Sequence, residues 1–239
     1  MAQRVSIAIE TSSRAGGLAL GRGAALVRTA GFDASLRHAA QLLTRLDALL
    51  RDANLAPGDL DEVYVSSGPG SFTGLRVGVT VARTLAQALD DVRCVAVPTA
   101  AAVAEGARDL PWEHLAVVFD AKGRNIYVQR FGRDGEGEIV PRGEARTLTE
   151  REFLDEAPRP LTLIGEGLDY HDLTGEGAAA APRDRWLPTA EGVWRVGRRL
   201  AQAGRFTPYI ELLPLYARRP EAVRLWERRG RDAPGGGGT

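Results

Sequence analysis

The chain has 239 residues, of which 44% are hydrophobic and 26% are charged. This length predicts one large or two small domains with a buried core, and this composition excludes general disorder. Its 31 basic residues balance 31 acidic residues, so the overall charge does not favour nucleic acid or an acidic membrane as a partner. No apolar run approaches the roughly 18 residues of a membrane span, and the strand-like start leads us to expect no secretory signal.

Cysteine use is minimal, because Cys94 is the only one in the chain. A single cysteine excludes an internal disulfide and a cysteine-built zinc site. It fits a reducing compartment, and we expect a cytoplasmic protein.

The first half alternates between two periodicities. Short apolar runs predict strands at 5–10, 17–20, 24–28, 63–66 and 92–97. Helical spacing predicts helices over 35–51, with Ser35 as N-cap, over 75–89 and from 99 to about 107. Strands that alternate with helices indicate an α/β fold with a partly parallel sheet.

The second half repeats this pattern more weakly. Ile7–Glu10 aligns with Val117–Asp120, and Leu161–Gly165 takes the place of Val63–Gly68. We predict an internal duplication. Its expected parts are a first lobe over residues 1–110, a degenerate second lobe over 111–217, and a basic, then glycine-rich tail over 218–239 that is partly disordered.

The rest of the second half has fewer clear signals. We expect a helix over 149–156 with Thr149 as its cap, a final amphipathic helix over 191–203, and irregular chain over 169–185.

Two carboxylates end the first strand of each half. Glu10 and Asp120 would lie at the carboxyl ends of their strands, where open α/β sheets bind ligands. Facing carboxylates there suit a hydrated magnesium ion beside a phosphate. The alternative is that each one caps the turn that follows it.

The segment Ser66–Arg76 is a glycine-rich loop that feeds a helix N-terminus, where free N–H groups attract anions. It lacks the Lys-Ser/Thr pair of a Walker A loop. The alternative is a tight turn that Ser71 or Thr73 caps. The candidate vestigial nucleotide or anion site comprises Glu10, Thr11, Gly68, Gly70, Ser71, Thr73 and Asp120.

The helix after this loop carries small residues every four positions, at Gly74, Gly78, Ala82 and Ala86. Each helical glycine costs about 1 kcal/mol relative to alanine, so the ridge needs a packing reason. It either packs within the chain or lets a partner helix approach closely.

The first helix carries two apolar stripes. Leu36, Leu43, Leu46 and Leu50 form one that can face the sheet, which leaves Leu42 and Leu49 beside polar residues. We therefore predict a protein interface on these two helices, comprising His38, Gln41, Leu42, Arg45, Leu49, Gly74, Gly78 and Ala82.

Several catalytic patterns are absent from the sequence. There is no H-E-x-x-H or H-x-x-x-H pair, and Gly70-Ser71-Phe72 does not supply a G-x-S-x-G elbow. We therefore expect no catalytic residue, no metal and no cofactor. The arginines of Arg218–Arg231, around Trp226, suit either RNA contact or a solvated tail.

Several stretches together resemble the TsaB (YeaZ-like) family. These are Ile7–Ser13 (I-A-I-E-T-S-S), His38–Leu43, Ser66–Gly78 (S-S-G-P-G-S-F-T-G-L-R-V-G), Val97–Thr99, Phe119–Tyr127 (F-D-A-K-G-R-N-I-Y) and Pro214–Arg218. They span most of the chain, although residues from about 132 to 205 match only loosely.

The resemblance implies a duplicated actin-like (ASKHA, ribonuclease H-like) α/β fold with two lobes. It also implies a non-catalytic subunit for threonylcarbamoyl transfer to the adenosine 3′ of the anticodon in tRNA. The implied partners are a TsaD-like catalytic subunit, bound by the first two helices, and a TsaE-like ATPase. The subunit would be a homodimer when alone and would meet tRNA only through the complex.

Two alternatives remain at the level of sequence. An actin-like ATPase or phosphotransferase would use Glu10, Asp120 and the loop from Gly68 to Gly74. A glycoprotease-type peptidase is the third reading, although the sequence offers no catalytic residues for it.

Overall fold

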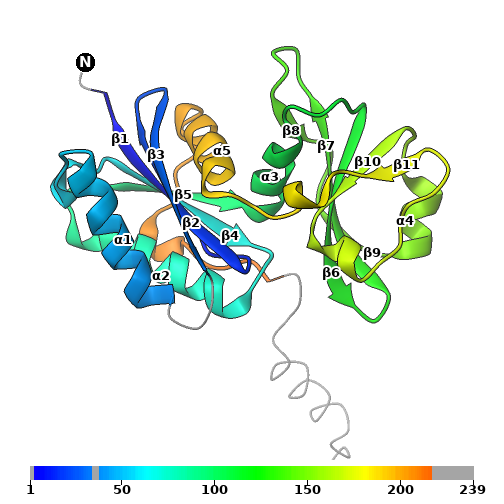
Figure 1. Ribbon diagram of the computed structural model, residues 1–239, viewed down its shortest axis with the longest axis horizontal. Coiled ribbons are helices and arrows are strands. Elements are labelled where there is room, and N and C mark those ends of the chain that lie inside the picture. The colour runs from blue at the N-terminus through cyan, green and yellow to red at the C-terminus, as the bar shows by residue number, and fades with distance from the viewer. Residues whose placement is uncertain (1–2, 34–37, 217–239) are drawn as a thin grey trace, which may run out of the picture.

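A computed structural model describes residues 3–33 and 38–216 of the chain (Figure 1). Ser35, the expected helix cap, and the arginine-rich and glycine-rich stretch from 218 onward lie outside these residues. The described chain forms two mixed sheets with five α-helices around them. In this part of the chain, no helix combines the length and the apolar character needed to span a membrane.

The first sheet has the strand order β3-β2-β1-β4-β5. Its strands are β1 (Val5–Glu10), β2 (Ala15–Arg22), β3 (Ala25–Asp33), β4 (Glu62–Gly68) and β5 (Arg93–Pro98). Strands β1, β2 and β3 are antiparallel neighbours, whereas β4 runs parallel to both β1 and β5. All residues of β1 are buried, which is why this central strand reads as a nearly continuous apolar run.

The second sheet repeats this topology, with the order β8-β7-β6-β10-β11 when it is read in the matching direction. Its strands are β6 (His114–Lys122), β7 (Asn125–Arg133), β8 (Ile139–Pro141), β9 (Arg146–Thr149), β10 (Leu161–Ile164) and β11 (Ala178–Ala180). Strand β10 is parallel to β6, as β4 is to β1. The predicted duplication and the two-lobed actin-like fold are therefore confirmed. The expectation of irregular chain over 169–185 misses the short strand β11.

The helices begin and end close to where their spacing predicts them. They are α1 (His38–Asp52), α2 (Phe72–Ala88), α3 (Thr99–Ala104), α4 (Glu150–Glu156) and α5 (Ala190–Gln202). Ser71 caps α2, and Thr149 caps α4, where the Thr149 hydroxyl accepts from the Glu152 N–H at 3.2 Å. The Glu152 carboxylate accepts in return from the Thr149 N–H at 2.8 Å, which completes a capping box.

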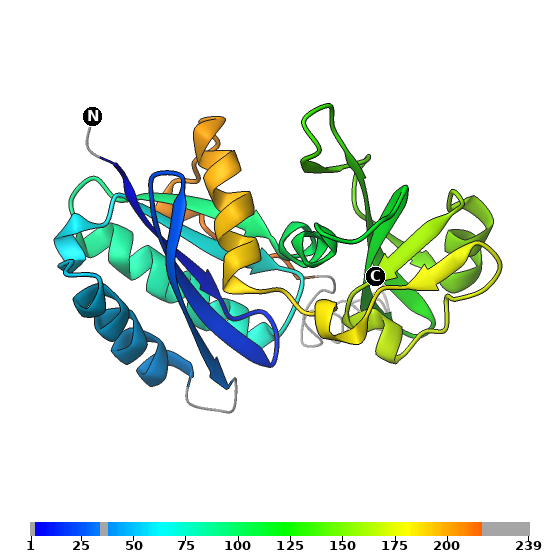
Figure 2. The same ribbon diagram turned by 45° about the horizontal axis from the view of Figure 1, so that its top comes forward.

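The first sheet is covered on both faces (Figure 2). Alternate residues such as Ile7 and Ile9 pack in a core with α1 and α2. Their neighbours, such as Ala8 and Ala19, pack with α5 on the opposite face. This alternation follows the two-residue period of a strand, and it gives the sheet two separate cores.

Two helices pack against the sheet formed by the other half of the chain. Helix α5 follows the second sheet in sequence but packs on strands of the first, and the chain after it pairs with β5 through Thr207 and Cys94. Helix α3, from the first half, packs against β6 through residues such as Val103 and Ala104. The expected second lobe, residues 111–217, is therefore corrected. Its last part belongs spatially to the first sheet, because α5 supplies the apolar cover for that sheet's second face.

Close contacts fix α5 on the first sheet. The Trp194 indole N–H donates to the Ser6 hydroxyl at 3.0 Å, and its ring lies over Gly21. A Cβ atom at Gly197 would overlap the ring of Tyr64, which is itself almost fully buried. Both glycines are thus sites where backbone and aromatic ring must touch.

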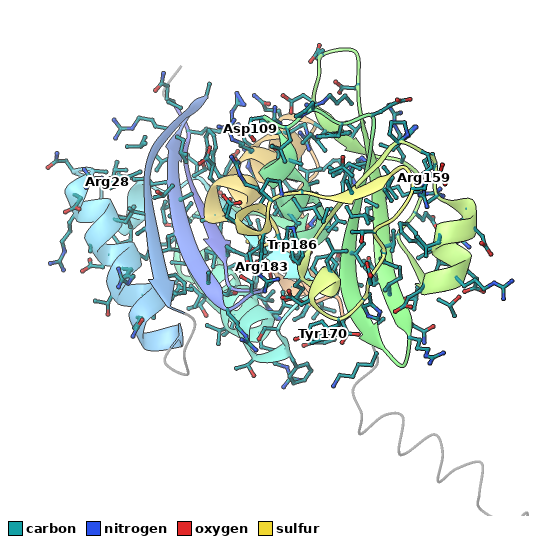
Figure 3. All side chains as sticks on the ribbon, turned by 45° about the vertical axis from the view of Figure 1, so that its right-hand side comes forward. Arg28, Asp109, Arg159, Tyr170, Arg183 and Trp186 are labelled. Atoms are coloured by element: carbon teal, nitrogen blue, oxygen red, sulfur yellow. The ribbon has the colours of Figure 1, made fainter. Side chains whose placement is uncertain are left out.

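The link from β11 to α5 is anchored near the middle of the molecule. Figure 3 shows Arg183 and Trp186 there, and the Arg183 guanidinium lies 5.0 Å from the centre of the Trp186 ring. Arg185 forms a two-point ion pair with Asp109, at 3.0 and 3.2 Å. The pair joins this link to the segment where the chain passes from the first sheet to the second.

We predict that Gly197→Val destabilises the protein by roughly 1–3 kcal/mol or more, because the new side chain overpacks the contact between α5 and Tyr64. Urea unfolding, followed by circular dichroism, measures the change. Gly31→Val is the matched control, since a Cβ there meets no atom within 4 Å. Equal stability of the two variants would contradict the described docking of α5.

Candidate functional site

The end of β1 holds a carboxylate that is fully buried. One oxygen of Glu10, Oε1, accepts from the Ser12 N–H at 2.5 Å and from the Ser12 hydroxyl at 2.6 Å. The other oxygen, Oε2, is buried and has no hydrogen-bond partner in the described chain. Glu10 thus acts as the cap of its own turn, which was one of the two roles expected for it.

Burial disfavours the charged form of this group. Desolvation raises the pKa of Glu10 from 4.5 to about 7, and the hydrogen bonds from Ser12 oppose this shift only partly. A buried oxygen without a donor is compatible with a protonated carboxyl group, which loses less solvation on burial.

The turn after Glu10 packs directly on the N-terminus of α2. The Ser12 carbonyl accepts from the Ser71 N–H at 2.7 Å, and the Thr11 hydroxyl donates to the Gly74 carbonyl at 2.8 Å. A Cβ atom at Gly70 would overlap Ser12, and one at Gly74 would overlap the Thr11 carbonyl. These glycines therefore allow the chain's own backbone to approach.

The other side of the loop is also covered. The Leu215 N–H donates to the Ser67 carbonyl at 2.6 Å, and a Cβ atom at Gly68 would overlap the Leu215 carbonyl. The Ser71 hydroxyl accepts from the Gly74 N–H at 3.3 Å as the helix cap, while Thr73 is exposed and has no capping role. The loop is thus a turn capped by Ser71, and the approaches at Gly68 and Gly70 are filled from within the chain.

Asp120 has different neighbours from Glu10. Its Oδ1 accepts from the Lys122 N–H at 2.7 Å and lies 3.2 Å from Nε2 of His171. Nδ1 of the same histidine lies 2.5 Å from Glu150. The hydrogen bonds of Asp120 thus involve other residues than those of Glu10, which bonds to Ser12. In that part of the chain, no group of three or more His, Cys, Asp or Glu side chains could hold a metal ion.

The contacts of His171 with Glu150 and Asp120 were not predicted from the sequence. Burial opposes a charge on its ring, but the contacts with Glu150 and Asp120 outweigh burial and raise its pKa. Both ring nitrogens face carboxylates, so the protonated imidazole suits the geometry best. The three residues are far apart in sequence, and no local signal could have found the group.

A second missed feature lies where the two halves of the chain face each other. Burial, then the nearby charges of Asp120 and Asp169, raise the pKa of Glu166, while Arg14 of the β1–β2 turn lowers it. The charge of Arg14, from the first half, therefore acts on an acidic group of the second half.

The structure corrects the expected interface on α1 and α2. Leu42 and Leu49 are almost fully buried in the core under these helices, together with Ala82. Gly78 is buried as well. It packs so tightly that a Cβ atom there would overlap the Thr11 hydroxyl and touch Val65. The glycine ridge and the second leucine stripe therefore pack inside the chain. The stripe prediction was wrong because the core-facing side of α1 carries Leu42 and Leu49 together with Leu46 and Leu50, whereas Leu43 faces outward.

The outer face of these helices carries different residues. Leu43, assigned to the sheet-facing stripe, is 51% exposed, and Arg45 is exposed while Gln41 is half-buried. His38 begins α1, but its side chain is outside the described part. On α2, small side chains recur on the side away from the sheet, at Thr73, Val77, Thr80, Thr84 and Ala88.

We predict that Glu10→Gln removes a pH-dependent loss of stability. The folded pKa of about 7 lies above the unfolded value of 4.5. The contribution of protonated Glu10 to the free energy of unfolding is therefore complete below pH 4.5. It is lost as the pH rises towards 7, and the full pKa shift corresponds to about 3 kcal/mol. Urea unfolding at several pH values should show a flatter profile for the variant than for the wild type.

Glu176→Gln is the control, because Glu176 is exposed. It should keep the wild-type profile. If Glu10→Gln also kept it, Glu10 would not be the buried acid described here.

Comparisons with known proteins place the chain in a family. Residues 32–160 match the model of the family TsaD, described as tRNA N6-adenosine threonylcarbamoyltransferase. The chain is 30% identical over 167 residues to the tRNA threonylcarbamoyladenosine biosynthesis protein TsaB of Bacillus subtilis, with 69% of this chain and 72% of that protein covered. It is 25% identical to TsaB of Escherichia coli, with 89% and 94% covered.

A solved structure agrees with these matches. YeaZ from Pseudomonas aeruginosa superposes with a TM-score of 0.76 at 25% identity, and the alignment covers 89% of this chain and 99% of that one. The family match covers more than half of the chain. The chain therefore belongs to the TsaD family of actin-like proteins, and within that family it is TsaB-like.

Proposed function

We propose that this protein is a non-catalytic partner subunit needed for threonylcarbamoyl transfer to the adenosine 3′ of the anticodon in tRNA. It acts by binding a TsaD-like catalytic subunit through the outer face of α1 and α2. Curated relatives from Bacillus subtilis and Escherichia coli are named for tRNA threonylcarbamoyladenosine biosynthesis, which supports a role in this modification.

The observation that carries the interface is the outer face of α2. Thr73, Thr80, Thr84 and Ala88 form an exposed row of short side chains there at helical spacing. The longer exposed side chains of Arg76 and Gln87 flank this row, and Arg76 lies against the ring of Phe72. The distance between two packed helices depends on the side chains at their contact, so this face permits close approach. Leu43 adds an exposed apolar side chain on neighbouring α1.

The remaining partners are part of the same proposal. A TsaE-like ATPase joins the complex, tRNA is met only through the complex, and the chain pairs with itself when the TsaD-like subunit is absent. A cytoplasmic setting suits these partners. Burial raises the pKa of the Cys94 thiol to about 11, so this cysteine is unreactive as a thiolate near neutral pH.

Contacts of the chain with itself disfavour the ATPase or phosphotransferase alternative. Glu10 is fully buried on Ser12, and the approaches at Gly68 and Gly70 are occupied by the backbone of Leu215 and Ser12. A phosphate would have to displace these contacts before it reached the loop.

We accordingly expect the isolated chain to bind magnesium–ATP more weakly than the micromolar range. Isothermal titration calorimetry measures this directly. Micromolar binding that Gly70→Val abolishes, in a variant that still folds, would instead favour the nucleotide-binding alternative.

For the interface, we predict that Leu43→Arg combined with Thr80→Arg abolishes co-purification with the TsaD-like subunit of the same organism. Two long cations on the outer face would block close helix approach and leave charges at the centre of the contact. Tagged pull-down and size-exclusion chromatography measure the complex.

Val27→Arg combined with Thr29→Arg is the matched control, because these residues are also one aliphatic side chain and one threonine and are exposed on the edge strand β3. The control should bind normally. Loss of binding in both double variants, or in neither, would contradict the proposed location of the interface.

A further inference from the structure

The last described stretch of the chain, residues 206–216, is here named the C-terminal strap. It begins at the open edge of β5, where the Thr207 N–H donates to the Cys94 carbonyl at 2.8 Å. It then passes beside α2 and ends at the N-terminus of that helix (Figure 1). There the ring of Tyr216 lies 4.9 Å from the ring of Phe72.

The strap exposes an unusual amount of apolar surface. Ile210 is 63% exposed, Leu213 is 64% exposed, and Tyr209 and Leu215 are also exposed. These four lie within seven residues, whereas the five other exposed large apolar side chains of the described residues are scattered from Val27 to Leu187. Clustered exposure of this kind marks an interaction site, whereas single exposed residues do not.

The strap is also held firmly in place. Leu212, between the exposed residues, is fully buried in the core that α1 and α2 share. The Leu215 N–H bonds to Ser67, and the Arg76 guanidinium lies 3.8 Å from the centre of the Phe72 ring and 3.3 Å from the Tyr216 hydroxyl. A surface that is already ordered loses little conformational freedom when a partner binds.

From these observations we infer that the C-terminal strap is a second part of the contact with the TsaD-like subunit, an inference that rests on the proposed function. Helix α2 has α1 as one neighbour and the strap as another, so a partner seated on α2 has the strap within its reach. Ile210 and Leu213 supply the apolar anchors, and they take an apolar patch on the partner.

The composition of the strap favours a protein, rather than a nucleic acid, as its binding partner. Glu211 is its only charged residue, and it is acidic. Binding to tRNA relies on basic side chains that neutralise phosphates, and the strap has none. Its exposed leucine, isoleucine and tyrosine side chains are those of an interface core, which loses charged residues and gains apolar ones.

The test compares affinities of full-length variants for the TsaD-like subunit. Ile210→Glu combined with Leu213→Glu should weaken binding at least tenfold, because two interface anchors become desolvated charges. Val27→Glu combined with Leu187→Glu is the control, since both residues are exposed and belong to β3 and to the link before α5 rather than to the strap. Thermal unfolding should show that both variants stay folded, and the control should bind like the wild type.

The outcomes separate the two proposals. If Leu43→Arg with Thr80→Arg abolishes binding while the strap variant binds like the wild type, the strap inference is wrong and the proposed function stands. If the wild type does not bind the TsaD-like subunit at all, both fail. If the strap variant changes only self-association, measured by light scattering, the strap is a contact between copies of this chain, and the inference is overturned.

Hydrogen exchange provides a readout that a general loss of stability would not imitate. In the wild-type complex, amides of residues 208–215 should become more protected than in the free chain. Equal protection in the free chain and the complex would overturn the inference.

Discussion

The structure depends on the contact between α5 and the second face of the first sheet. That face presents small or aromatic groups, Ala8, Ala19 and Tyr64, and α5 meets them with Gly197 and Trp194. Without α5 the central strand β1, which is buried on both sides, would expose one face to water. The chain must therefore complete its second half before its first sheet is fully covered, and this need brings the strap back beside α2.

Contacts of the chain with itself also explain why the glycine-rich loop does not form an open phosphate-binding site. Gly68, Gly70 and Gly74 each allow a backbone carbonyl to come close, and in each case the carbonyl belongs to this chain. The contacts fix the turn after β1, the start of α2 and the strap relative to one another. The glycine-rich loop thus holds the start of α2 and the strap in position. In the proposed complex these are parts of the surface that meets the partner, although the loop itself is covered.

Much of the fold could be predicted from the sequence, because strand and helix periods, caps and the repeat are local signals. Thr149 was predicted as a cap, and Ser71 was one of the two caps, with Thr73, that the loop sequence offered. The residues on the outer face of α1 could not be predicted, because Leu42 and Leu43 are adjacent and a helical pattern does not say which leucines face the core. Contacts such as His171 with Asp120 and Glu150 join distant parts of the chain and leave no local trace.

The two halves have the same strand order, yet the carboxylates that end their first strands have diverged. Glu10 is buried with one oxygen unpaired and a pKa of about 7, whereas Asp120 contacts His171 and the Lys122 N–H. Each group has hydrogen-bond partners from its own half of the chain, so equivalent positions in the repeat have acquired different surroundings. In the proposed complex, the surfaces that meet a partner are therefore the outer faces of α1 and α2 and the strap, which lie away from both carboxylates in sequence.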